Sequence, residues 1–351
     1  MAAQDDALLT TKAPPLSCEE ASRFASSRFG VGGVAKALTS ERDQNFHLRA
    51  VDGAQYVLKV ANPAEDAAVL DFQNRALEHM ALVDPDLPVP RLVRAIDGAA
   101  TCVLQAPDAP PRIVRLLTWL SGLMLHQVPR TPRLRADLGA LHARVGLALR
   151  DFSHPAADHH LSWDLKHTLE LERLLPHVAD PGRRALAERA LERFARRAQP
   201  ALARLRTQVI HNDLNFHNVV VAEDDPERIA GVLDFGDMVR SPLACDAAVA
   251  AAYHVRPDAT PLADAGEYLA AYHAVSPFED AELEVLADLI LGRLVMTVLI
   301  TGWRATEHPE NRDYILRNNP VAWAGLAALE AMGPGEAADT LRRACRAGGA
   351  R

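Results

Sequence analysis

The sequence predicts an α+β protein with two lobes: an N-terminal antiparallel sheet with one helix, then a mostly helical C-terminal lobe. Between residues 44 and 120, short apolar runs alternate with turn signals, which is typical of strands. After Ser121 and Gly122 the chain is rich in Ala, Leu, Arg and Glu at helical spacing. The boundary therefore falls near residue 120, with lobes over 16–120 and 121–351.

The N-terminal elements follow from local signals. Residues 1–15 are polar and end in two prolines, so we expect a flexible arm. Ser17 can cap a short helix over 16–30. Asp52 and Gly53 form a turn signal between two strand-like runs, and a helix follows Pro63. Strands are expected over 44–51, 55–60, 92–96, 101–105 and 113–119.

The C-terminal lobe has helical spacing over 131–150 and 165–205, a strand-rich interruption over 208–240, and helices from 242 onward. Its most apolar stretch, Leu286 to Trp303, contains Asp288 and Arg293. Two charges within 18 residues favour a buried helix over a membrane span.

Composition limits the possible partners. The formal charge is 38 − 46 = −8, whereas a nucleic-acid-binding protein would show a basic footprint. The first residues lack the basic and apolar regions of a signal peptide. We therefore expect a cytoplasmic protein with no nucleic-acid or membrane partner, and the sequence leaves its oligomeric state open.

The segment from Val209 to Asp237 carries the chemistry. Asp213 and Asn218 are five residues apart on a loop between apolar runs, and Asp234 follows 21 residues after Asp213 at the end of a returning hairpin. Phosphoryl transfer needs a carboxylate beside the attacking hydroxyl, and oxygen ligands for Mg²⁺. The pattern His-x-Asp-Leu-x-x-x-Asn followed by Asp-Phe-Gly matches kinase motifs.

Two further observations bear on this interpretation. Lys59 lies in the apolar run Val57 to Val60, as in the Val-Ala-Ile-Lys pattern of a kinase strand. The competing interpretation makes His211 and His217 metal ligands, but their spacing of six in a non-helical segment argues against it.

These motifs resemble the aminoglycoside phosphotransferase and choline kinase superfamily, which has a protein-kinase-like fold, over roughly residues 20–330. Within it the sequence looks most like the hydroxylysine kinase branch. The similar stretches are SERDQNF (40–46), YVLKVANPAEDAAVLDFQNRAL (56–77), VRLLTWLSG (114–122), VIHNDLNFHNVVV (209–221) and GVLDFGDM (231–238).

The resemblance implies a role for each matching residue. Asp213 would be the catalytic base, Asn218 and Asp234 the Mg²⁺ ligands, and Lys59 the lysine on the nucleotide phosphates. Asp246 matches an aspartate that braces the catalytic loop, although a helix cap explains it equally well. The other implied nucleotide-binding residues are the loop from Ser40 to Asn45 over the phosphates, and the hinge formed by Thr118, Trp119 and Leu120.

The sequence departs from the family pattern at two places. Most members have glycine where Asn212 stands. Gln73 occupies the position of the helix glutamate that usually pairs with the lysine, and Glu78 is an alternative partner of Lys59. An amide can hydrogen-bond a lysine but forms no ion pair with it.

The acceptor site is less defined. Asp237 could bind a substrate ammonium or support its loop, and Asp164, after Trp163, could contact substrate or cap a helix. A substrate carboxylate would need a cation, for which Arg304 or Arg293 is a candidate.

Together these features predict a Mg²⁺-dependent small-molecule kinase. It would transfer the γ-phosphoryl group of ATP or GTP to a hydroxyl of an amine-bearing substrate, first of all a hydroxyamino acid such as 5-hydroxylysine. Alternatives are an aminoglycoside phosphotransferase or a choline, ethanolamine or homoserine kinase. A different class is a non-catalytic nucleotide-binding regulatory module.

Overall fold

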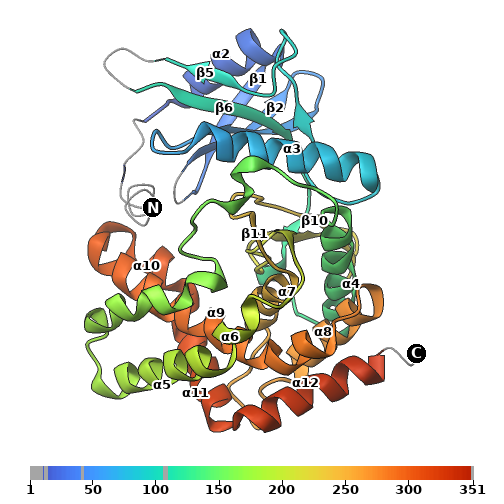
Figure 1. The fold of residues 1–351 in the computed structure, drawn as a ribbon. Coiled ribbons are helices and arrows are strands. Elements are labelled where there is room, and N and C mark those ends of the chain that lie inside the picture. The colour runs from blue at the N-terminus through green and yellow to red at the C-terminus, as the bar shows by residue number, and fades with distance from the viewer. Residues whose placement is uncertain (1–10, 12–14, 41–42, 106–109, 349–351) are drawn as a thin grey trace. The chain divides into compact units, whose positions relative to one another are not determined.

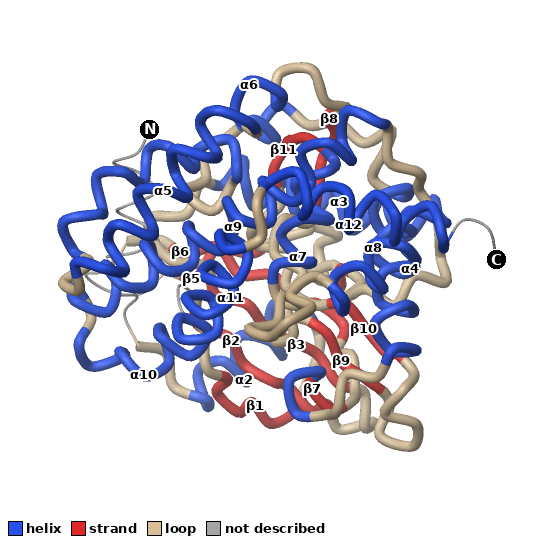
Figure 2. The backbone as a smooth tube through the Cα atoms, turned by 90° about the horizontal axis from the view of Figure 1, so that it is seen from below, coloured by secondary structure: helices blue, strands red, loops and turns tan. Residues whose placement is uncertain are grey.

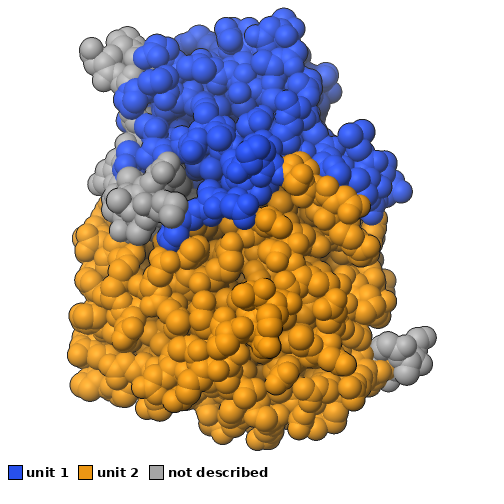
Figure 3. Space-filling view, in the orientation of Figure 1, with its two compact units in different colours: residues 1–122, 154–160, 230–233 blue, residues 123–153, 161–229, 234–351 orange. Residues whose placement is uncertain are grey.

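The computed structural model describes residues 11, 15–40, 43–105 and 110–348 (Figure 1). Most of the predicted arm, residues 1–10 and 12–14, lies outside these residues. The chain divides into two compact units (Figure 3). Unit 1 comprises residues 1–122, 154–160 and 230–233, and unit 2 comprises 123–153, 161–229 and 234–351. The predicted α+β class is confirmed.

Unit 1 is built on an antiparallel sheet in which the strands follow the order β1-β2-β3-β6-β4, and β5 also pairs with β6. Gly53 turns the chain between β2 and β3 at a φ of 88°, a conformation that glycine adopts without strain. The strands are β1 (Gly33–Leu38), β2 (Gln44–Ala50), β3 (Gln55–Val60), β4 (Leu92–Val93), β5 (Cys102–Leu104) and β6 (Arg112–Thr118).

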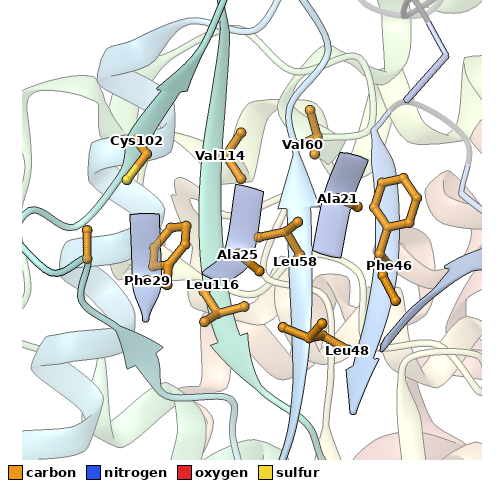
Figure 4. Close-up of a cluster of buried hydrophobic side chains, with 12 residues drawn as sticks. Ala21, Ala25, Phe29, Phe46, Leu48, Leu58, Val60, Cys102, Val114 and Leu116 are labelled. Atoms are coloured by element: carbon orange, nitrogen blue, oxygen red, sulfur yellow. The ribbon is translucent and has the colours of Figure 1, made fainter. Parts of the chain in front are cut away.

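One face of this sheet packs on helix α2 (Cys18–Phe29), which begins with the predicted Ser17 cap, here a capping box with Glu20. Figure 4 shows Ala21, Ala25 and Phe29 of this helix against the strand side chains. Burying each large aliphatic or aromatic side chain contributes about 1.5–3 kcal/mol. The strand residues of this core are Ala35, Phe46, Leu48, Leu58, Val60, Cys102, Val114 and Leu116.

Helix α3 (Ala67–Val83) is the predicted central helix of unit 1. The Asp66 side chain caps it by accepting from the N–H of Ala68. Gln73 and Asn74 on this helix are buried and bond to Arg115 of β6. α3 is therefore joined to the sheet by polar contacts.

Unit 2 is mostly helical. Helix α9 (Asp280–Glu307) is its buried centre, in contact with α5, α7 and α11 (Figures 1 and 2). Its other helices of at least ten residues are α4 (Pro132–Ala148), α5 (Pro181–Arg197), α7 (Leu243–Ala252), α8 (Ala263–Val275), α11 (Asn319–Ala331) and α12 (Pro334–Gly348). The short helices are α6 (Gln199–Leu202) and α10 (Arg312–Ile315). The strands beyond residue 122 are β7 (Leu123–Met124), β8 (Thr207–Ile210), β9 (Val219–Val221), β10 (Ile229–Val232) and β11 (Val239–Pro242).

Two details concern the predicted helices. The segment Leu165–His177 is a 3-10 helix rather than the start of an α-helix, and Pro176 near its end lacks the N–H that an α-helix would use. The stretch Leu286 to Trp303 is a buried helix, as predicted, and Asp288 within it accepts hydrogen bonds from Arg193 and Arg197. Among the described residues, no helix has the length and apolarity needed to cross a membrane.

Candidate active site

The loop between β8 and β9 carries Asp213. Both of its carboxylate oxygens are hydrogen-bonded. Oδ1 accepts from Arg293 Nη2 at 2.9 Å, while Oδ2 accepts from Asn218 Nδ2 at 2.8 Å and from Asn215 Nδ2 at 3.0 Å. These bonds fix the Asp213 side chain in place. Because the side chain is 22% exposed, it is still accessible from solvent.

Asn212 gives this loop its turn. Its φ is 64°, in the left-handed region where asparagine is among the better tolerated non-glycine residues. This backbone conformation explains why asparagine can stand where most family members have glycine.

Asp246, in the first turn of α7, braces the same loop. Its carboxylate accepts from the N–H of Asn212 at 2.8 Å and of His211 at 3.3 Å. Its Oδ2 also lies 3.0 Å from His142 Nε2, and His142 contacts the Tyr268 hydroxyl through its other ring nitrogen. Burial opposes ionisation, but His142 and the loop N–H groups hold the pKa of Asp246 below its usual range. Asp246 thus holds the loop backbone rather than capping its own helix.

Arg293, on the buried helix α9, joins several parts of the site. Besides Asp213, its guanidinium donates to the Trp163 carbonyl at 3.2 Å and lies 4.7 Å from the centre of the Trp163 ring. Its Nη2 also lies 3.5 Å from the Tyr253 hydroxyl. A buried arginine fixed by these contacts gives the Asp213 carboxylate one orientation.

Carboxylates gather around Asp213. Burial raises the pKa of Asp213 to about 7; Arg293 opposes this shift, and the negative charges of Asp237 and Asp234 add to it. Asp237 is itself buried. This excess of negative charge favours binding of a cation.

Asn218 and Asp234 supply oxygens that fit a hard cation. The Asn218 amide donates to Asp213 through Nδ2, which leaves its Oδ1 to serve as a ligand. Asp234 has a φ of 53°, and its Oδ1 accepts from the N–H of Gly236 at 3.3 Å. The donor set therefore fits Mg²⁺.

The alternative histidine site is not assembled. The Nδ1 of His211 accepts the Asp213 N–H at 3.2 Å, and its ring packs edge-on against Phe235. The His217 ring instead lies 4.2 Å from that of His126. The two imidazoles thus make separate structural contacts.

The predicted substrate residues have different environments. Trp163 is partly exposed beside Arg293. Asp164 is fully buried, caps the following 3-10 helix, and accepts from Ser241 Oγ at 2.7 Å, as its alternative interpretation predicted. Arg304 is buried eleven residues beyond Arg293 on α9, about 16 Å along the helix axis at 1.5 Å per residue. Asp164 and Arg304 therefore lack the access that Trp163 has.

In unit 1, Lys59 lies on β3 between two polar neighbours: its direct Cα partners are Asn45 on β2 and Arg115 on β6. Gln73 Oε1 accepts a hydrogen bond from Arg115 Nη2 at 2.7 Å, and Glu78 pairs with Arg75 and Arg94. Glu78, the alternative partner of Lys59, is therefore engaged elsewhere.

The predicted phosphate loop and hinge also lie in unit 1. Ser40 Oγ accepts from Asn45 Nδ2 at 3.1 Å, while residues 41–42 lie outside the described residues. The N–H of Thr118 donates to Arg91, and that of Trp119 donates to the Gln55 carbonyl, at 2.9 and 3.0 Å. The N–H groups of two of the three predicted hinge residues are therefore engaged within unit 1.

Sequence reasoning missed two contacts. It considered Arg293 only as a cation for the carboxylate of a substrate, whereas the structure shows Arg293 bound to the carboxylate of Asp213. It gave Arg115 no role, because an arginine in a strand has no local pattern that identifies its partners on a distant helix. Their positions in the sequence offered no signal of either contact.

The fold and the site define a phosphotransferase with a protein-kinase-like architecture. The family model described as "Phosphotransferase enzyme family" matches residues 34–286, and the chain belongs to this family. Its members' chemistry makes the protein an enzyme that phosphorylates a hydroxyl group.

Several individual proteins are similar to this chain. The chain is 26% identical to the hydroxylysine kinase of Mus musculus over 338 residues, covering 90% of this chain and 89% of that protein. A solved microcompartment-associated aminopropanol kinase shares the fold at a TM-score of 0.69 and 20% identity, covering 93% of this chain and 97% of that one. An amicoumacin kinase in complex with AMP-PNP and Ca²⁺ does so at 0.60 and 13%, covering 90% and 92%.

Proposed function

We propose that the protein transfers the γ-phosphoryl group of ATP or GTP to the hydroxyl of a small amine-bearing substrate, with 5-hydroxylysine as the first candidate. The main support for this proposal is the arrangement of Asp213. Hydrogen bonds from Arg293, Asn215 and Asn218 hold its carboxylate in one orientation, and the side chain remains partly exposed. The similarity to hydroxylysine kinases supports the choice of acceptor.

Each group has a defined task in this proposal. Asp213 orients the acceptor hydroxyl and takes its proton, and Lys59 binds the nucleotide phosphates. Asn218 and Asp234 would hold Mg²⁺, which supplies positive charge against the phosphate oxygens. The Ser40 loop and Leu120 contribute backbone N–H groups to phosphate and base.

The acceptor amine has a candidate partner in Asp237. Its buried negative charge acts on both Asp213 and Arg293. The partly exposed Trp163 ring offers a surface for the aliphatic part of the substrate. Asp164 is left out of this binding site because it caps a 3-10 helix and accepts from Ser241, and Arg304 because it lies about 16 Å along α9 from Arg293.

The test is a coupled assay of nucleoside diphosphate release with Mg²⁺ and ATP or GTP. The acceptors are 5-hydroxylysine, homoserine, ethanolamine, choline and kanamycin. Turnover with 5-hydroxylysine that falls 10²- to 10⁴-fold in Asp213→Asn would support the proposal, because general base catalysis contributes about that much. Exposed Asp258→Asn is the matched control.

Other outcomes discriminate among the alternatives. Turnover with a different acceptor alone would replace 5-hydroxylysine. Nucleotide binding without turnover on any acceptor above the Asp213→Asn level would instead favour a non-catalytic nucleotide-binding module.

A further inference from the structure

The loop between β8 and β9 is anchored at two points within unit 2. At its start, Asp246 accepts from the N–H groups of His211 and Asn212. Further along, the ring of Phe216 packs edge-on against that of His254, with the ring centres 4.9 Å apart. His254 is 5% exposed and lies two residues after the end of α7. The two anchors therefore lie on either side of the proposed base.

Tyr268 of helix α8 contacts the supports of both anchors. Its hydroxyl is hydrogen-bonded to Nδ1 of His142, and Nε2 of the same ring lies 3.0 Å from Asp246 Oδ2. The Tyr268 ring stacks on the His254 ring, with the centres 5.1 Å apart and the planes 19° from parallel. Tyr268, His142 and Asp246 are fully buried. One buried side chain thus connects the two ends of the loop.

The positions of the protons in this group follow from the charge of Asp246. Its pKa lies below the usual range, so at neutral pH the carboxylate is ionised and can only accept. The Nε2 of His142, which faces this acceptor at 3.0 Å, therefore carries a proton. A neutral imidazole then has its lone pair on Nδ1, so the Tyr268 hydroxyl donates to it. Phenylalanine in place of Tyr268 would leave this buried acceptor without a donor.

We propose that Tyr268 is a positioning residue for this loop. Its hydroxyl keeps the His142 ring in the form that is protonated on Nε2, and this form presents an N–H to Asp246. Its ring supports the other anchor through His254. Tyr268 affects phosphoryl transfer only through the placement of Asp213, and this part of the inference rests on the proposed function.

Helix α8 also provides a matched control in Tyr272, four residues further along. Tyr272 is fully buried, and its ring packs edge-on against that of His142 with the centres 5.5 Å apart. Among the described residues, the Tyr272 hydroxyl has no hydrogen-bond partner. Tyr268→Phe and Tyr272→Phe therefore each remove one hydroxyl from the same helix beside the same histidine, but only Tyr268→Phe removes a hydrogen bond.

Ring 15N chemical shifts of His142 test the protonation directly. The signals can be assigned in the wild type through nuclear Overhauser contacts to the rings of Tyr268 and Tyr272. At pH 7.5 we expect a proton on Nε2 and none on Nδ1, both in the wild type and in Tyr272→Phe, and a displaced Nδ1 signal in Tyr268→Phe. A proton on Nδ1 in the wild type would overturn the proposal, and so would one identical His142 spectrum in all three proteins.

Hydrogen exchange and kinetics report on the loop itself. We expect Tyr268→Phe to speed amide exchange at His211 and Asn212 at least tenfold and to lower kcat about tenfold, while the KM values of nucleotide and acceptor change less than twofold. Tyr272→Phe should keep the exchange rates and kcat within about twofold of the wild type. Equal effects of the two variants, or a higher KM with an unchanged kcat, would overturn the positioning role.

The spectra and the exchange rates need no acceptor. Failure of every acceptor therefore contradicts only the proposed function. Unchanged exchange at His211 and Asn212 in Tyr268→Phe contradicts only the positioning role of Tyr268.

Discussion

Arg293 Nη2 donates to Asp213 Oδ1 at 2.9 Å, which joins the buried helix α9 to the loop between β8 and β9. Arg293 is 2% exposed, so its charge is removed from water and is stabilised by the opposite charge of Asp213. The residue that orients the proposed base therefore comes from a helix 80 positions further along the chain.

Replacing Arg293 with Met should lower kcat by 10²- to 10³-fold and cost about 3–5 kcal/mol of stability, because it leaves the Asp213 carboxylate without its buried partner. Steady-state kinetics and urea unfolding measure the two effects. Arg173→Met, which removes an exposed arginine stacked on Trp303, is the control. Wild-type kcat in Arg293→Met would contradict the positioning role.

Asn212 should accept glycine but not alanine. Its left-handed φ of 64° costs alanine about 1–2 kcal/mol, whereas glycine adopts it freely. Within the described part of the chain the Asn212 Oδ1 has no hydrogen-bond partner, and its Nδ2 donates to the Trp163 carbonyl at 3.4 Å, so the alanine and glycine variants lose the same contact. Urea unfolding should show Asn212→Ala less stable than Asn212→Gly by this amount, with kcat kept within about threefold in the glycine variant. Equal stability of the two variants would refute the backbone argument.

Asp246 and His142 should behave as one coupled unit. Asp246→Asn keeps the side-chain shape but removes the charge that holds His142 and the loop N–H groups, at an expected cost of about 3 kcal/mol and a lower kcat. A double-mutant cycle with His142→Phe should give a coupling energy of about 1–3 kcal/mol. Additive effects would mean that the two residues act independently.

The free energy of unfolding should depend on pH because His254 titrates differently in the folded and unfolded states. Burial lowers the pKa of His254 to about 3, and the charges of Arg135 and Arg130 add to this. Below about pH 6.5 the unfolded chain binds a proton that the folded protein does not, so stability is full above that pH and falls as the pH drops. The loss is about 1.4 kcal/mol per pH unit, or roughly 2 kcal/mol at pH 5.

Urea unfolding at pH 7.5 and pH 5 would measure this effect. Removing the titrating group in His254→Gln should reduce the loss of stability between the two pH values by about 2 kcal/mol. The exposed His177→Gln should lose as much stability as the wild type. If His254→Gln also loses as much as the wild type, another group is responsible.

Much of the fold follows from local sequence. The Ser17 cap, the Asp52 and Gly53 turn and the apolar spacing of α3 depend on neighbours within a few residues, and each was predictable. The helix expected from residue 165 is present, and residues 165–177 adopt the 3-10 form. Alternation and helical spacing identify elements, but they do not distinguish closely related helical geometries.

The sequence by itself determined the reaction class, because Asp213, Asn218 and Asp234 lie in short motifs whose spacing reflects local loop geometry. Only the tertiary structure decided which side chains that are distant in the sequence contact one another. Arg293 meets Asp213 across 80 residues, and Arg115 meets Gln73 across 42. Such contacts depend on how helices and strands pack. The hydrophobic effect that drives packing is non-directional, so no short stretch of sequence specifies which distant residues it brings together.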